Sequence, residues 1–117
     1  MTNLDYSKEL NSFSFNYNLS SITYINDETK QRIIISKLYY ALVHYYFMEY
    51  PEVATSTGTQ QHERLLLTIE KNRNDNEYQL FKTLKILRVW ADYKPLDSAP
   101  FPINLQRRLH QVFKTIN

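Results

Sequence analysis

The feature that most restricts the fold of this chain is an apolar helical period that stops at a proline. Apolar side chains recur at intervals of three or four residues, as they do on one face of an α-helix: Leu80, Leu84, Leu87 and Ala91. Pro95 disfavours helical dihedral angles at Lys94, so we expect this helix to end at about Tyr93. Arg88 and Asp92 are four residues apart, which places them one above the other on a neighbouring face.

Further segments of the chain show the same helical period. We expect helices over residues 4–13, 29–50, 60–72 and 77–93 and from about residue 103, with a loop over residues 51–61. The helix over 29–50 should be the most buried, with one apolar face formed by Ile34, Leu38, Ala41, Tyr45 and Met48. No stretch alternates between apolar and polar residues with a period of two, and the chain has one Gly. We therefore predict a single all-α domain over residues 1–117, a bundle of four to five helices with mostly antiparallel neighbours.

Tyrosine is frequent in the central part of the chain. Of the ten Tyr in the sequence, five fall on the helix expected over 29–50: Tyr39, Tyr40, Tyr45, Tyr46 and Tyr50. Their rings could fill the core or meet a second subunit, because Tyr combines a large apolar body with a polar tip. We expect some of them to lie in a subunit interface.

Composition excludes several classes of site. The chain has no Cys, so it can hold neither a disulfide nor a thiolate-bound metal, and its three His lack the short spacing of a metal site. We expect no metal and no cofactor. No apolar run is long enough to span a membrane, and we expect a cytoplasmic protein. Residues 60–117 carry ten Lys and Arg against six Asp and Glu, so this half is the better candidate for binding an anion.

Two motifs carry a resemblance to a known family. Residues 88–93 read Arg-Val-Trp-Ala-Asp-Tyr, and residues 36–44 read Ser-Lys-Leu-Tyr-Tyr-Ala-Leu-Val-His. They resemble the Arg-x-x-Ala-Asp-Tyr and Ser-x-x-Tyr-Tyr-Ala-x-x-His motifs of small prokaryotic HEPN-domain proteins, which are often found beside minimal nucleotidyltransferases. His62, at the start of a helix after a Gly-containing loop, is a third, weaker match.

The resemblance covers about residues 30–95 and implies a helical bundle that forms a homodimer. It also implies a role in prokaryotic defence or in a toxin–antitoxin system, with RNA, a nucleotide, a nucleotidyltransferase or another defence-complex (for example CRISPR-type) protein as the partner. HEPN ribonucleases are recognised by an arginine followed, after four to six intervening residues, by a histidine. After Arg88 these positions hold Tyr93, Lys94 and Pro95, so the ribonuclease motif is absent.

The candidate site residues follow from these motifs. For anion or nucleic-acid binding they are Arg88, whose planar fork suits phosphate, together with Tyr93, Lys85 and Lys94. Alternatively, a metal-independent ribonuclease would need a rearranged site, drawn from Arg88, Asp92, Tyr93, His44 and His62. A third alternative is a structural subunit of a larger complex, with the aromatic helix over residues 29–50 as its contact surface. In a structural role, the Arg88–Asp92 pair would only fix the helix end against Tyr39 or Tyr40.

Overall fold

The structure is a computed structural model that describes residues 1–16, 27–56, 60–93, 110, 112 and 114–116. These residues are mainly helical and include no strand, which confirms the all-α prediction. The elements are α1 (Asn3–Asn16), α2 (Asp27–Glu49), α3 (Pro51–Ala54), α4 (Gln61–Asn72) and α5 (Asp75–Tyr93). The described residues near the C-terminus, from His110 to Ile116, are also helical; the rest of the helix predicted from residue 103 lies outside the described residues.

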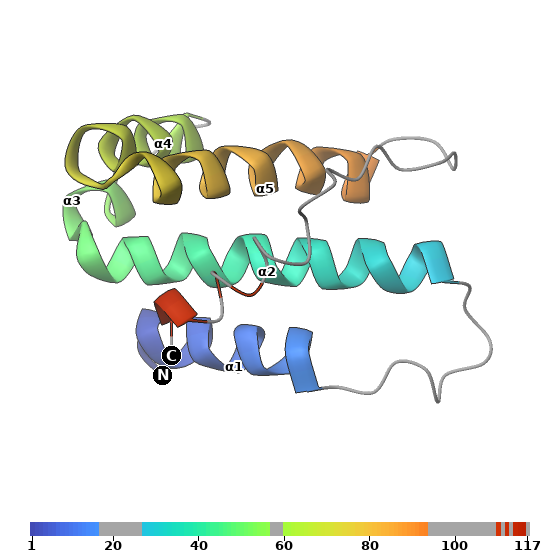
Figure 1. The fold of residues 1–117 in the computed structure, drawn as a ribbon. Coiled ribbons are helices and arrows are strands. Elements are labelled where there is room, and N and C mark those ends of the chain that lie inside the picture. Colours follow the sequence, from blue (N-terminus) through green and yellow to red (C-terminus); the bar gives the residue numbers. More distant parts are fainter. Residues whose placement is uncertain (17–26, 57–59, 94–109, 111, 113, 117) are drawn as a thin grey trace.

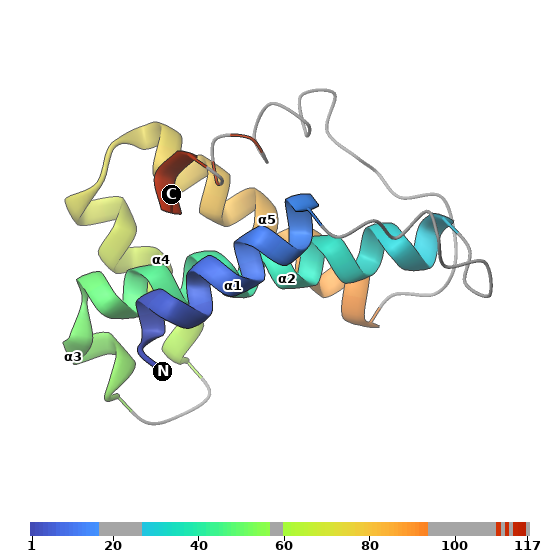
Figure 2. The ribbon, with the colours of Figure 1, turned by 90° about the horizontal axis from the view of Figure 1, so that it is seen from below.

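Helix α2 is the central layer of the molecule. Figure 1 shows α5 on one side of α2 and α1 on the other, each running antiparallel to it, with α4 beside α5. Seen from below in Figure 2, α1 crosses in front of α2 at an oblique angle. Within the described residues, no helix combines the length and the apolar character that crossing a membrane requires.

The apolar face predicted for α2 is only partly right. Leu38 and Ala41 are buried, but Ile34 and Tyr45 are only partly buried and Met48 is 36% exposed. The buried side chains of α2 instead lie around much of its circumference: Ile35, Leu38, Tyr39, Ala41, Leu42, Val43 and Tyr46. A helix covered from two sides has no single apolar face, so its periodicity is a poor guide to which residues are buried.

The tyrosines of α2, with Tyr50 just after it, belong to the core of this chain. Tyr39 and Tyr46 are 0% and 1% exposed, and Tyr40, Tyr45 and Tyr50 pack against the same core. The core of one chain accounts for these rings, and the expected subunit interface stays a prediction.

The predicted loop over residues 51–61 begins with a short helix, α3. Pro51 occupies its first turn, where a missing N–H costs nothing and a fixed φ favours the helix. Gln61 Nε2 donates hydrogen bonds to the carbonyl oxygens of Val53 (3.2 Å), Ala54 (3.0 Å) and Ser56 (3.3 Å). These bonds tie the start of α4 to α3 and so help to fix the position of the neighbouring residue, His62.

Helix α5 has the core face that the sequence predicts. All four predicted residues are buried, and Phe81 and Trp90 widen the face. Arg32 of α2 lies over the Trp90 ring at 4.1 Å and donates to the carbonyl oxygens of Trp90 (2.9 Å) and Ala91 (3.3 Å). A cation at the C-terminal end of a helix also interacts favourably with the helix dipole. The last turn of α5, which carries Asp92 and Tyr93, is therefore held against α2.

Candidate anion-binding site

Three helices bring polar and aromatic side chains together around Arg88. Because α2 and α5 are antiparallel neighbours, Tyr39 and Tyr40 of α2 lie beside Arg88 of α5. The first turn of α4 adds His62 and Glu63. We call the cluster of Tyr39, Tyr40, His62, Arg88, Asp92 and Tyr93 the Arg88 site.

Two of the three guanidinium nitrogens of Arg88 have partners. Its Nη2 donates to the Tyr40 hydroxyl at 2.6 Å, and its Nε lies 2.9 Å from Asp92 Oδ2. The latter contact is an ion pair without the alignment of a hydrogen bond. The guanidinium carbon also lies within 6 Å of the rings of Tyr39, Tyr40 and Tyr93. Arg88 Nη1 makes no hydrogen bond to any described residue, so one edge of the fork remains available.

His62 joins the site through Tyr39. The Tyr39 hydroxyl and His62 Nδ1 are 2.6 Å apart. Burial raises the pKa of the Tyr39 hydroxyl, which therefore keeps its proton and can donate a hydrogen bond to Nδ1 or accept one from it, according to the His62 tautomer. Burial, together with the charges of Arg88, Lys85 and His44, lowers the pKa of His62, so the imidazole is neutral at neutral pH. Its Nε2 has no hydrogen-bond partner among the described residues and carries the imidazole hydrogen when the Tyr39 hydroxyl donates to Nδ1.

The same two rings connect His62 to Arg88. The His62 ring lies 5.6 Å from the Tyr39 ring and 6.2 Å from the Tyr40 ring. The Arg88 guanidinium lies 5.9 Å and 5.4 Å from those rings. The His62 imidazole and a partly free guanidinium therefore face the same pair of tyrosines.

Not every residue predicted for the site lies in it. His44 Nδ1 is 2.9 Å from Asn3 Oδ1, and its ring packs against Tyr6 of α1, so none of its described contacts reaches Arg88. Lys85 forms an ion pair with Glu63 instead of a free basic rim. Lys94 lies outside the described residues.

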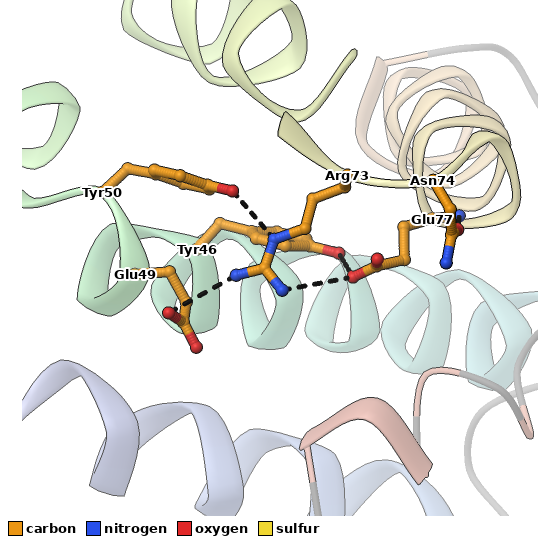
Figure 3. Close-up of polar contacts among 6 residues, drawn as sticks. All are labelled: Tyr46, Glu49, Tyr50, Arg73, Asn74 and Glu77. Carbon is orange, nitrogen blue, oxygen red and sulfur yellow. Dashed lines mark hydrogen bonds and ion pairs between the residues drawn. The ribbon is translucent and has the colours of Figure 1, made fainter. Parts of the chain in front are cut away.

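A second arginine cluster, which the sequence analysis missed, joins the other ends of the same helices (Figure 3). Arg73 follows α4, and its Nε donates to the Tyr50 hydroxyl at 2.8 Å. Its Nη2 lies 3.4 Å from Glu49 and its Nη1 lies 3.8 Å from Glu77. The Tyr46 hydroxyl donates to the same Glu77 carboxylate at 2.9 Å.

Comparing the two arginines shows which one can take a ligand. Each has a carboxylate four residues later, a tyrosine hydroxyl and stacked tyrosine rings. All three nitrogens of Arg73 have partners, and two carboxylates neutralise its charge. Arg88 has one carboxylate and an unused Nη1. The Arg73 cluster is a structural clamp closed by its own contacts, whereas Arg88 keeps one nitrogen without a partner among the described residues.

Among the described residues there is no metal site that would indicate a function, and no known relative indicates one. In the described ranges, no three His, Asp or Glu side chains gather closely enough to hold a metal ion. Comparisons with protein-family models, with curated proteins and with solved structures found no match to this chain.

Proposed function

We propose that the protein binds RNA by holding a backbone phosphate at the Arg88 site, as a HEPN-like bundle of four to five helices in a cytoplasmic defence or toxin–antitoxin setting. The observation that carries this proposal is the incomplete pairing of Arg88, in contrast with the complete pairing of Arg73. Phosphate oxygens suit a planar guanidinium fork, and a charge-assisted bond to Nη1 would complete its pairing.

The neighbouring side chains suit the other parts of a nucleotide. In the tautomer with its hydrogen on Nε2, His62 supplies a neutral donor beside the guanidinium. Tyr93 is 70% exposed and lies against Arg88, so its ring offers a stacking surface for an unpaired base. Together these groups favour single-stranded RNA, whose phosphates and bases are both accessible.

Replacing Arg88 with alanine is expected to weaken binding of single-stranded RNA by about 1–3 kcal/mol and to make the salt dependence shallower. The free energy of unfolding should also fall, by about 1–3 kcal/mol, because the Arg88 and Asp92 side chains are only 20% and 29% exposed and the change also removes the bond to Tyr40. Fluorescence anisotropy over a salt series and urea denaturation measure the two effects.

The matched control is Arg64→Ala, since Arg64 is exposed on α4 and its side chain has no ion pair with a described residue. It should change RNA binding much less than Arg88→Ala. Equal losses in both variants would point to nonspecific attraction by net charge and would contradict the proposed site.

The position of His62 favours a second candidate function, a metal-independent ribonuclease. His62 and Arg88 contact the same two tyrosine rings, although the sequence lacks the expected Arg…His spacing. A histidine beside a phosphate-binding arginine can exchange protons with a 2′-hydroxyl. The Tyr39 bond would hold its ring in one tautomer.

If this second function operates, the wild type should cleave labelled single-stranded RNA in the presence of EDTA. His62→Gln should then reduce the rate by a factor of about 10²–10⁴, the range expected for loss of a general acid or base. His44→Gln is the control, because His44 packs against α1. Undiminished cleavage by His62→Gln would exclude this mechanism.

We further propose that a second copy of the chain pairs with the outer face of α5. This face lies opposite the core and repeats at intervals of three and four: Gln79, Lys82, Ile86 and Val89. Ile86 is 63% exposed and Val89 is 38% exposed. In an antiparallel pair, Ile86 of each copy would meet Val89 of the other. In a larger complex the same face, rather than the aromatic helix, would supply the contact.

Size-exclusion chromatography with light scattering should give a dimer at micromolar concentration. Ile86→Lys should shift it to monomer, because two charges would face an apolar contact. Leu67→Lys, at an exposed position on α4, should leave the dimer unchanged. A wild type that stays monomeric at 100-fold higher concentration would refute the proposed dimer.

A further inference from the structure

A pocket between α2 and α5 adjoins the Arg88 site. It has a volume of about 280 Å³ and lies where the first half of α2 faces the last turn of α5. Its lining residues are Thr29, Arg32, Ile33, Ser36, Lys37, Ala91 and Asp92. Asp92 is therefore both the ion-pair partner of Arg88 and part of the pocket wall.

The pocket continues the Arg88 site along α2. Ser36 is four residues before Tyr40, so the two side chains lie about one turn apart on one face of the helix, about 6 Å along its axis. Tyr40 in turn bonds Arg88. A ligand that reaches both places would thus follow α2 toward its N-terminus.

The polar groups of the pocket have complementary chemistry. Lys37 is exposed and forms no ion pair with any described residue, so its ammonium group can meet an anion. The hydroxyl of Ser36 makes no hydrogen bond to a described residue and can donate or accept. Asp92 uses Oδ2 toward Arg88 and leaves Oδ1 as an acceptor. Arg32 is held on Trp90 and adds positive charge to the wall.

We propose that this pocket binds the ribonucleotide next to the one whose phosphate contacts Arg88, with Lys37 on its phosphate and Ser36 and Asp92 on its ribose hydroxyls. The inference rests on the proposed function of the Arg88 site and names its ligand as at least a dinucleotide. A pocket of about 280 Å³ lies just below the usual range for small-molecule sites and suits one nucleoside, not a longer segment.

The pocket can recognise a ribose through the Asp92 carboxylate and the Ser36 hydroxyl in its wall. A carboxylate oxygen accepts a hydrogen bond from a 2′-hydroxyl, and a deoxyribose cannot donate one. The pocket should therefore distinguish RNA from DNA, whereas phosphate contacts alone would not.

The test is calorimetric titration of the full-length chain at low salt with uridine 5′-monophosphate, the 5′-phosphorylated diuridylate pUpU and its deoxy counterpart. The wild type should bind pUpU about tenfold more tightly than the monophosphate, and more tightly than the deoxy dinucleotide. Lys37→Ala should remove most of this gain and leave monophosphate binding within about twofold. Lys8→Ala, on the exposed face of α1, is the control and should change neither affinity.

The outcomes separate the two levels of the proposal. If neither uridine ligand binds the wild type, both the Arg88 site and this pocket are refuted. If the monophosphate binds but pUpU binds no more tightly, or if Lys37→Ala weakens both ligands equally, only the pocket is refuted. Equal affinity for the ribose and deoxyribose dinucleotides would overturn the roles of Ser36 and Asp92.

Discussion

Replacing Phe81 with alanine is expected to lower the free energy of unfolding by about 3–5 kcal/mol. The Phe81 side chain is fully buried, and its ring centre lies 5.4 Å from that of Tyr39 and 5.9 Å from that of Tyr46. Removing it would leave a cavity between the tyrosine that reaches the Arg88 site and the tyrosine that reaches the Arg73 clamp. Urea denaturation followed by circular dichroism measures the loss.

Two variants on the same helix make this test specific. Phe81→Leu retains much of the volume and should cost less than Phe81→Ala. Ile86→Ala, at a position that is 63% exposed, should change stability by less than about 0.5 kcal/mol. A loss below 1 kcal/mol for Phe81→Ala would show that this part of the core is not packed as described.

The core of α5 could be predicted from the sequence because this helix packs from one side. Leu84 and Leu87 are 0% and 3% exposed, while Ile86 and Val89 face away from the core. One covered side gives one apolar stripe, which periodicity detects. For α2, covered by both α1 and α5, the same method gave a face that included the exposed Met48.

In the candidate site, the contact within one helix could be predicted from the sequence, and the contacts between helices could not. The Arg88–Asp92 ion pair follows from a spacing of four residues on one helix, and it was predicted. The bond between Tyr39 and His62 joins residues 23 positions apart, and the Lys85–Glu63 ion pair joins residues 22 positions apart. Such contacts depend on how the helices pack, which helical periodicity in one sequence does not specify.

The Arg73 clamp was missed although local signals for it were present. Arg73 and Glu77 are four residues apart, as are Tyr46 and Tyr50. Because Arg73 falls between the helices predicted over residues 60–72 and 77–93, the helical spacing was not applied to it. In the structure its guanidinium lies 5.6 Å from the Tyr46 ring and 5.5 Å from the Tyr50 ring, so this connection is a packed contact between α2, α4 and α5.

Replacing Arg73 with methionine is expected to lower the free energy of unfolding by about 2–4 kcal/mol. The change removes a charge-assisted hydrogen bond to Tyr50 and leaves Glu49 and Glu77 without their common cation. A fully buried ion pair loses about 3–5 kcal/mol when one partner is removed; the Arg73 and Glu77 side chains are 24% and 22% exposed, which moderates the loss. Methionine retains much of the apolar stem, so the change tests mainly the charge and its bonds.

The double variant Arg73→Met/Glu77→Gln distinguishes charge from packing. If the loss arises mainly from an uncompensated carboxylate, neutralising Glu77 should recover at least about 1 kcal/mol relative to Arg73→Met alone. RNA affinity should remain unchanged in both variants, because the clamp lies at the opposite ends of the helices from Arg88. The reverse pattern, with Arg73→Met abolishing RNA binding while stability is retained, would show that the ligand binds at Arg73 and not at Arg88. It would also contradict the argument that complete pairing marks Arg73 as structural.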